Sequence, residues 1–300
     1  MKKENLSLVQ KRNSVTNRAA AVFLAPVIIL LIIYIFYPII ETFRISAFKW
    51  NGISAEPRLI GIDNWNTLLH DRKFWIAFFN NVKIMILSIM IQIPIGLAMA
   101  TFAEFAGKKA TVFKVFWFIP MLMSSVAIGF LFRYALATNG GIISSISQLI
   151  AGKNIDLLGN PKTALYAVIG VIAWQFIPFY MVYSVAAYTN ITQDVYEASI
   201  IDGANKWQYF IRIALPLLAP SLKSAAILSM IGSMKYCDLV YSMTGGGPGT
   251  STELMATYMY KLSFSNFKMG YGSAVAGGMF LLISFTALLT MKILNRGEEV

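Results

Sequence analysis

The chain has 300 residues, of which 57% are hydrophobic and 13% are charged. Soluble domains carry roughly 25% charged residues, so this composition excludes a water-soluble globule and predicts a membrane protein. The formal net charge is +11, but the basic residues are spread among the loops without an aromatic-interleaved stripe, which excludes nucleic-acid binding and favours contacts with lipid headgroups.

The first predicted element is a membrane span at about 19–40. Its apolar run of about 20 residues exceeds the h-region of a signal peptide, and no small-residue cleavage site follows it, so we expect the span to be retained. The tail before it, 1–18, has one acidic residue, Glu4, against a cluster of bases: Lys2, Lys3, Lys11, Arg12 and Arg18. The positive-inside rule therefore predicts a cytoplasmic N-terminus.

Further apolar stretches of spanning length lie at about 82–103, 113–136, 164–188, 217–241 and 271–293. A span needs about 20 residues, so these stretches predict an all-α polytopic membrane protein with six transmembrane helices over residues 19–293. Six spans return the C-terminal tail, 294–300, to the cytoplasm.

Polar and aromatic residues concentrate in the fourth and fifth spans. Such groups are costly in hydrocarbon unless they face a cavity or a partner, so they are candidates for a solute path. Ring faces combined with amide and hydroxyl groups suit a sugar, although aromatic residues in spans also serve for packing and interfacial anchoring. Lys235 and Asp238, three residues apart on one predicted helix, are expected to form an ion pair. The path candidates are Trp174, Gln175, Tyr180, Tyr183, Ser233, Tyr236 and Asp238.

The connection between these two spans, about 194–212, is expected to form a bent pair of short helices. Asp194 and Glu197 sit where carboxylates favour a helix start, Gly203 allows a bend, and Pro216 is expected to restart the chain into the next span. Apolar residues recur at helical spacing and predict one exposed face: Tyr196, Ile200, Ala204, Trp207 and Ile211.

This apolar face needs either the membrane surface or a protein partner. A helix lying on the membrane usually displays Lys and Arg on its polar face. Here Asp194, Glu197 and Asp202 dominate instead. We therefore favour docking to a protein.

A pattern with fixed gaps runs through the same connection: Glu197, Ala198, Gly203, Ile213, Leu215 and Pro216, with Ser199 as the one departure. It resembles the signature of the membrane subunits of bacterial binding-protein-dependent ABC importers, whose pattern has a second alanine at the position of Ser199. Two more stretches are similar to the sugar-importing, maltose- and glycerol-phosphate-like branch: Gly61-Ile62-Asp63-Asn64-Trp65, and Asp238 through Thr244-Gly245-Gly246-Gly247-Pro248. The resemblance runs from about residue 20 to 290.

The resemblance implies a type I importer fold in the bacterial inner membrane and half of a translocation path for a sugar or oligosaccharide. Its implied partners are a second permease subunit, favoured as a homologue in a heterodimer, two cytoplasmic ATPases that bind ATP and Mg, and an extracytoplasmic binding protein. Coupling to the ATPases would rest on Glu197, Ala198, Ser199, Asp202, Gly203, Ile213, Leu215 and Pro216. The loop Gly245, Gly246, Gly247 and Pro248 would meet the binding protein.

We expect no catalytic residue, metal or cofactor in this chain. His70 is the only histidine and Cys237 the only cysteine, which excludes His-pair and thiol metal sites. The segment 245–250 lacks the Lys and following helix of a P-loop. The alternative function is a stand-alone secondary transporter or channel for a small polar solute, but we find neither paired mid-span charges nor inverted repeats with broken helices.

Overall fold

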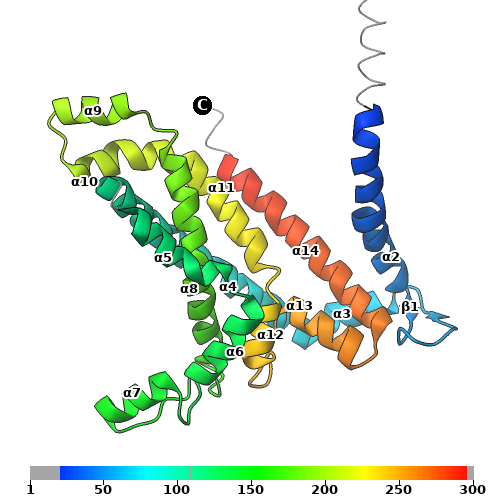
Figure 1. The fold of residues 1–300 in the computed structure, drawn as a ribbon. Helices are drawn as coiled ribbons and strands as arrows, with labels where there is room; N and C mark the ends of the chain where they lie inside the picture. Colours follow the sequence, from blue (N-terminus) through cyan, green and yellow to red (C-terminus); the bar gives the residue numbers. More distant parts are fainter. Residues whose placement is uncertain (1–20, 108–109, 296–300) are drawn as a thin grey trace, which may run out of the picture.

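The computed structural model describes residues 21–107 and 110–295 (Figure 1). The predicted tail 1–18 and residues 296–300 lie outside the described residues. Among the described residues, five helices are long and apolar enough to cross a membrane, and a bent helix pair makes a sixth if it is counted as one span. The predicted all-α polytopic class is confirmed.

The first half of the described chain begins with the helix Ala21–Ile45, which contains the π-helical turn η1 (Ile32–Phe36) and α2 (Tyr37–Ile45). An antiparallel pair of short strands, β1 (Phe48–Lys49) and β2 (Arg58–Leu59), follows. The next elements are α3 (Asp63–His70), α4 (Arg72–Ala106), α5 (Ala110–Leu122), α6 (Ser125–Ala135), α7 (Ile142–Ala151) and α8 (Ala164–Tyr188).

The second half starts with two short helices, α9 (Gln193–Ile201) and α10 (Lys206–Tyr209). It continues with η3 (Phe210–Ala214), α11 (Leu215–Ser233), α12 (Asp238–Thr244), α13 (Met255–Tyr260), η4 (Lys261–Ser265) and α14 (Met269–Asn295). The connecting segments gather at two ends of the bundle (Figure 1): α9 and α10 lie at one end, and α3, α7, α12 and α13 lie at the other.

The third predicted span, 113–136, is not one straight helix. Its two parts, α5 and α6, are bent by 91°. Pro120 lies in the last turn of α5, and Ser124 takes extended backbone angles, φ −60° and ψ 132°, before α6 begins. The bend lays α6 against α12, with Gly129 so close to Ser242 that a Cβ at Gly129 would lie 2.7 Å from the Ser242 Cβ.

The fifth span differs from the predicted range, 217–241, at both ends. The chain stays helical from Lys206 to Ser233, so Pro216 does not restart it. The turn η3 explains this, because the Leu215 N–H reaches back five residues to the Phe210 carbonyl and shifts the hydrogen-bond register just before the proline. Helix α11 ends before Asp238 begins α12, so the prediction that Lys235 and Asp238 share a helix is wrong.

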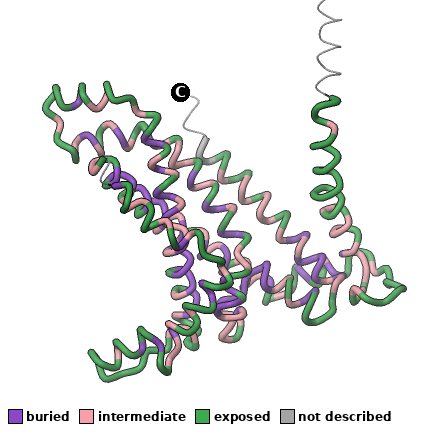
Figure 2. Tube along the Cα trace, viewed as in Figure 1, coloured by how far each residue is buried: buried purple, intermediate pink, exposed green. Residues whose placement is uncertain are grey.

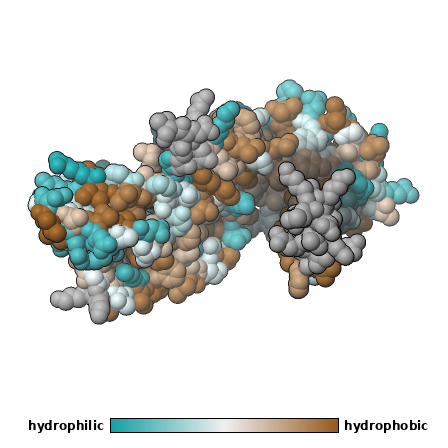
Figure 3. Space-filling view, turned by 90° about the horizontal axis from the view of Figure 1, so that it is seen from above, coloured by the Kyte–Doolittle hydropathy of each residue, from teal (hydrophilic) through white to brown (hydrophobic). Residues whose placement is uncertain are grey.

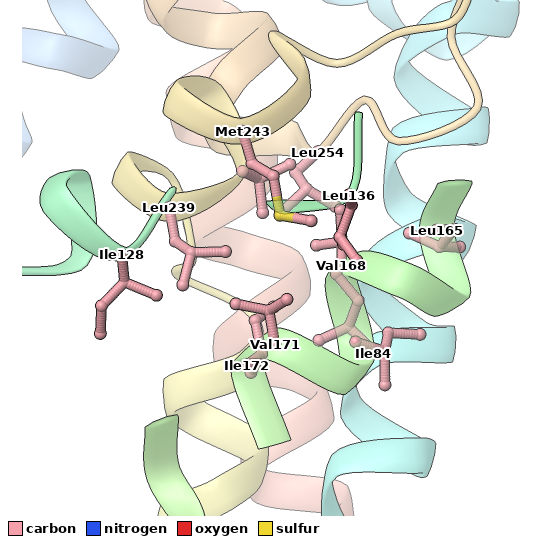
Figure 4. Packing of buried hydrophobic residues seen from close by; sticks show 12 residues of the cluster. Ile84, Ile128, Leu136, Leu165, Val168, Val171, Ile172, Leu239, Met243 and Leu254 are labelled. Carbon is pink, nitrogen blue, oxygen red and sulfur yellow. The ribbon is translucent and has the colours of Figure 1, made fainter. Parts of the chain in front are cut away.

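Burial is densest along α4, α8 and the α6–α12 contact (Figure 2). At Gly96 a Cβ would lie 2.7 Å from the Tyr180 Cβ, so the glycine lets α4 and α8 approach closely, as small residues do in membrane helices. Figure 4 shows the largest apolar cluster, in which side chains from four helices meet: Ile84, Ile128, Val168, Ile172, Leu239 and Met243.

Two residues of the sequence motif 61–65 bind the end of the N-terminal helix. The Asn64 amide donates to the Ser46 carbonyl at 2.8 Å, and the Trp65 indole donates to the Ser46 hydroxyl at 2.9 Å. The Trp65 ring also stacks on Phe43 with 5.9 Å between centroids. These contacts tie α3 to the end of α2. Farther along the same helix, the 18-residue apolar window is 0% buried within this chain.

The Asp71 carboxylate joins the start of α4 to α13 and α14, and we call this contact the carboxylate clamp. Asp71 accepts hydrogen bonds from the Tyr258 hydroxyl at 2.6 Å and from the Tyr271 hydroxyl at 2.5 Å. It also caps α4 by accepting from the Lys73 N–H at 2.8 Å. Burial by itself would raise the pKa of Asp71, but these bonds outweigh it and hold the pKa below its usual value.

We expect Asp71→Asn to lower the apparent free energy of unfolding at pH 7 by about 1–3 kcal/mol, because the clamp loses its charged acceptor. Because the pKa of Asp71 is lower in the folded than in the unfolded state, its charge stabilises the fold. This stabilisation is complete above the unfolded-state pKa of about 4 and is lost as the pH falls below that value. The gap in melting temperature between parent and variant should therefore narrow below pH 4, and Tyr258→Phe should have a smaller effect. A gap of equal size at pH 7 and pH 3 would contradict this explanation.

Candidate functional site: the exposed hairpin and the solute path

The connection between α8 and α11 is a helical hairpin with a left-handed turn. Gly203 has φ +81°, a conformation that L side chains rarely adopt, so the turn needs glycine. The Gly203 N–H donates to the Ile200 carbonyl and the Ala204 N–H to the Ser199 carbonyl, each at 2.9 Å, which closes the end of α9. Ser199 is buried, and its hydroxyl donates to the Tyr196 carbonyl.

The second arm of the hairpin is fixed by a capping box. The Asn205 side chain accepts from the Gln208 N–H, and the Gln208 side chain accepts from the Asn205 N–H, both at 2.9 Å. The rings of Tyr196 and Tyr209 pack edge to face with 4.9 Å between centroids, which holds α9 against α10. The hairpin is therefore a rigid unit joined to the continuous helix Lys206–Ser233.

The predicted single apolar face is split in the structure. Tyr196 turns inward onto Tyr209 because α9 and α10 are separate helices with a turn between them. Ile211 in η3 is 43% exposed. Closer to the turn, three apolar side chains remain uncovered: Ile200 is 52% exposed, Ile201 85% and Trp207 69%. We call these three residues the hairpin face. Figure 3 looks onto this end of the molecule, where hydrophobic residues (brown) interrupt the hydrophilic surface (teal) at the left.

The carboxylates expected at this site lie beside the hairpin face. Glu197 and Asp202 are both exposed. Glu197 lies in the middle of α9, not at its start, because the helix begins at Gln193. The Gln193 side-chain amide donates a hydrogen bond to the Glu197 carboxylate at 3.3 Å. Ala198 and Pro216 are exposed, whereas Ile213 and Leu215 are half-buried in the apolar cluster that anchors the hairpin to the bundle. The first residues of the motif are thus exposed on the hairpin, and Ile213 and Leu215 attach the hairpin to the bundle.

Three of the predicted path residues are enclosed by the chain itself: Gln175 is 3% exposed, Tyr180 5% and Ser233 0%. The Gln175 amide donates to the Ser125 hydroxyl at 3.1 Å. Within the described residues, the Gln175 carbonyl oxygen and the hydroxyls of Ser233 and Ser88 have no hydrogen-bond partner. The seam between α4, α8 and α11 therefore contains buried polar atoms that lack hydrogen-bond partners, which costs free energy in the present conformation.

Three other path candidates are half-buried and packed against rings. Trp174 meets Phe132 edge to face at 5.2 Å, and Tyr236 lies 5.5 Å from Phe176. Tyr183 lies 6.3 Å from Phe179. Asp238 alone of these candidates starts a helix outside the long spans, where it is exposed. Sequence reasoning missed Ser88 and Gln92, buried on α4, although two polar residues four apart inside an apolar span were a readable signal.

The glycine-rich loop after α12 is tightly built. The Thr244 and Thr252 hydroxyls lie 2.7 Å apart across the loop, and the Asn80 amide on α4 donates to carbonyls on its far side, including that of Glu253 at 3.0 Å. The buried Glu253 carboxylate pairs with Lys261 at 2.5 Å. A Cβ at Gly246, which has φ +87°, would lie 2.6 Å from the Glu253 carboxylate, so glycine is required there.

The described residues contain no group of three or more His, Cys, Asp or Glu side chains that could hold a metal ion. His70 is exposed, and its ring nitrogen Nδ1 lies 2.9 Å from the Asn66 carbonyl oxygen.

Comparison with known proteins shows which family the chain belongs to. Residues 92–299 match the family described as the binding-protein-dependent transport system inner membrane component. The chain belongs to this family. A probable ABC transporter permease of Bacillus subtilis, YurN, is 31% identical over 92% of this chain and 96% of its own length. A probable permease for starch degradation products from Thermoanaerobacterium thermosulfurigenes, AmyD, is 30% identical over 92% of this chain and 94% of its own.

The fold of this permease is also found in a solved structure. A chain of a bacterial alginate ABC transporter, crystallised with an alginate pentasaccharide-bound periplasmic protein, superposes with a TM-score of 0.79 over 96% of each chain at 20% identity, which shows a shared fold. The predicted resemblance to ABC importer permeases is thereby confirmed. The permease is a multi-pass protein of the inner membrane.

Proposed function

We propose that this permease is the non-catalytic membrane subunit of an ATP-driven importer and forms half of the path for a sugar or oligosaccharide. The observation that carries the proposal is the hairpin face, an uncovered apolar surface on a rigid hairpin, flanked by exposed carboxylates. The names of relatives support the sugar class: starch degradation products for AmyD, trehalose and maltose for MalF of Thermococcus litoralis, and lactose for LacF of Rhizobium radiobacter.

The hairpin would be the joint between membrane and ATPase. Ile200, Ile201 and Trp207 would seat in a cleft of a cytoplasmic ATPase subunit, and Glu197 would pair with a base on its rim. The ATPases would hold ATP and Mg. Because the second arm continues directly into the helix Lys206–Ser233, motion of the hairpin would be passed to the span as a rigid lever.

The path would lie along α8 and α11 and be completed by a second permease subunit, which we propose to be a homologue. Gln175, Tyr180 and Ser233 are enclosed here, so these helices would part before a solute reaches them. The unpaired atoms of Gln175, Ser233 and Ser88 favour such a movement, because solute hydroxyls or water would then satisfy them. The loop Gly245–Pro248, at the opposite end from the hairpin, would meet the extracytoplasmic binding protein.

Purification and reconstitution test this function. An affinity-tagged chain solubilised from its native membranes should retain an ATPase and a second permease. In liposomes the complex should hydrolyse ATP faster when a sugar-loaded binding protein is added, and uptake should require ATP. Uptake by the chain alone, without ATPase or ATP, would support the stand-alone transporter instead.

A further inference from the structure

Two adjoining hollows open where α6 lies against α12 and α13. One has a volume of about 450 Å³ and the other of about 680 Å³, and Arg133 and Tyr241 line both. Each falls within the range of about 300–1,000 Å³ that is usual for small-ligand sites. The 91° bend between α5 and α6 creates them, because it turns α6 across the end of the bundle.

The smaller hollow is lined by aromatic rings. Tyr241 and Tyr260 pack edge to face at 5.2 Å and are each about two-fifths exposed, and Phe130 on α6 is exposed as well. These rings come from three different helices and leave apolar faces uncovered toward the hollow. Ring faces of this kind bind the C–H faces of a sugar.

The same hollow carries a donor and an acceptor that do not satisfy each other. Arg133 and Asp238 both line it and are both exposed. Among the described residues neither forms an ion pair within 4 Å. A guanidinium donates several hydrogen bonds in a fixed fork, whereas a carboxylate only accepts. Neighbouring hydroxyls of a sugar, which donate and accept, would bridge the two groups.

The charges around the two hollows favour a neutral ligand. Arg133 and Lys261 are the bases, and Lys261 is already paired with Glu253. Asp156 lines the larger hollow and Asp238 the smaller one, so two carboxylates stand against Arg133 once the paired Lys261 is set aside. An acidic sugar would meet net repulsion here.

We infer that these hollows form an outer subsite for a neutral oligosaccharide, with Arg133 and Asp238 binding hydroxyls and Tyr241 and Tyr260 supporting ring faces. This inference rests on the proposed function and adds to it. The larger hollow is also lined by Gly247 and Pro248 of the loop that would meet the binding protein. The subsite therefore adjoins the surface where the sugar would be handed over, ahead of the enclosed seam at Gln175 and Ser233.

The only cysteine of the chain provides a direct test, because Cys237 lines the smaller hollow and its thiol is free. The purified complex is treated with N-ethylmaleimide, and alkylation of the Cys237 peptide is followed by mass spectrometry. Burial, Asp238 and Glu253 raise the pKa of Cys237, so a mildly alkaline buffer is used. The probes are maltotriose, trehalose, lactose and, as an acidic comparison, trigalacturonate.

A neutral sugar that the complex transports should slow alkylation about tenfold at ten times its Kd, whereas trigalacturonate should not. Arg133→Gln and Tyr241→Ala should raise the sugar concentration needed for this protection by about 10- to 200-fold. Arg58→Gln, which removes an exposed base on β2 away from the hollows, is the matched control and should leave protection unchanged.

Three results would overturn the subsite. One is a transported neutral sugar that gives no protection, which leaves the importer function standing. Another is protection by trigalacturonate alone. The third is a Cys237 that reacts in the chain purified alone but not in the native complex, which would mean that a partner subunit covers the hollow. Absence of transport for every sugar would instead count against the proposed function.

Discussion

Placing a carboxylate on the hairpin face should release the ATPase from the importer. Ile201 is 85% exposed and Trp207 69%, and large apolar anchors of this kind contribute about 2 kcal/mol or more each to an interface. We expect Ile201→Asp to weaken ATPase retention about 30-fold, and the pair Ile201→Asp, Trp207→Asp to abolish it. Membrane insertion should be normal because both side chains are mostly exposed and the ring contact of Trp207 is with the nearby Phe210. The measurement is the amount of ATPase that co-purifies with the tagged chain.

Thr192→Asp is the matched control for this prediction. It adds the same charge to the same helix, but at its exposed N-cap position, where aspartate is favoured. This variant should keep its ATPase and transport at the parental rate. Equal retention of ATPase by the control and by the double variant would remove the docking role of the hairpin face.

Breaking the buried ion pair of the glycine-rich loop should have the largest effect on stability. Lys261→Met leaves the Glu253 carboxylate buried without its counter-charge, which typically costs about 3–5 kcal/mol. The apparent melting temperature in detergent should fall. Binding-protein-stimulated ATP hydrolysis should fall with it, because the Glu253 carboxylate lies so close to the loop that Gly246 has no room for a Cβ.

Two companion variants isolate the ion pair. Lys268→Met removes an exposed lysine seven residues away, for which the described structure shows no ion pair, and should be nearly neutral. Adding Glu253→Gln to Lys261→Met removes the unpaired charge and should restore most of the lost stability. If the double variant melts no higher than Lys261→Met, the cost does not arise from an isolated carboxylate.

The elements that the sequence predicted well are those that depend on local chemistry. Apolar runs of spanning length identified the long helices, because hydrocarbon demands a continuous apolar segment whatever its neighbours are. The bend at Gly203 was predicted for the same kind of reason, since a glycine between two helical stretches offers the positive φ found there. The motif from Glu197 to Pro216 then indicated the family before any contact was known.

The errors arose where the outcome depended on neighbouring segments. Hydropathy alone could not place the bend between α5 and α6, because the two helices together are apolar enough for one span, and α6 packs on α12 after the bend. The same limit applied to Pro216, where the register shift at η3 kept the helix intact. It applied again to the hairpin face, where Tyr196 was drawn inward by the ring of Tyr209.

The sequence by itself determined the membrane class, the long spans and the hairpin between α8 and α11, because periodicity, hydropathy and glycine act within a few residues. Only the tertiary structure decided which polar groups are enclosed and which are open. Of the predicted path residues, Gln175 and Ser233 are enclosed by the chain itself, whereas Asp238 is exposed. Arg133 precedes Asp238 and Tyr260 by more than a hundred residues, and only the 91° bend and the packing of α6 on α12 bring the three to one hollow.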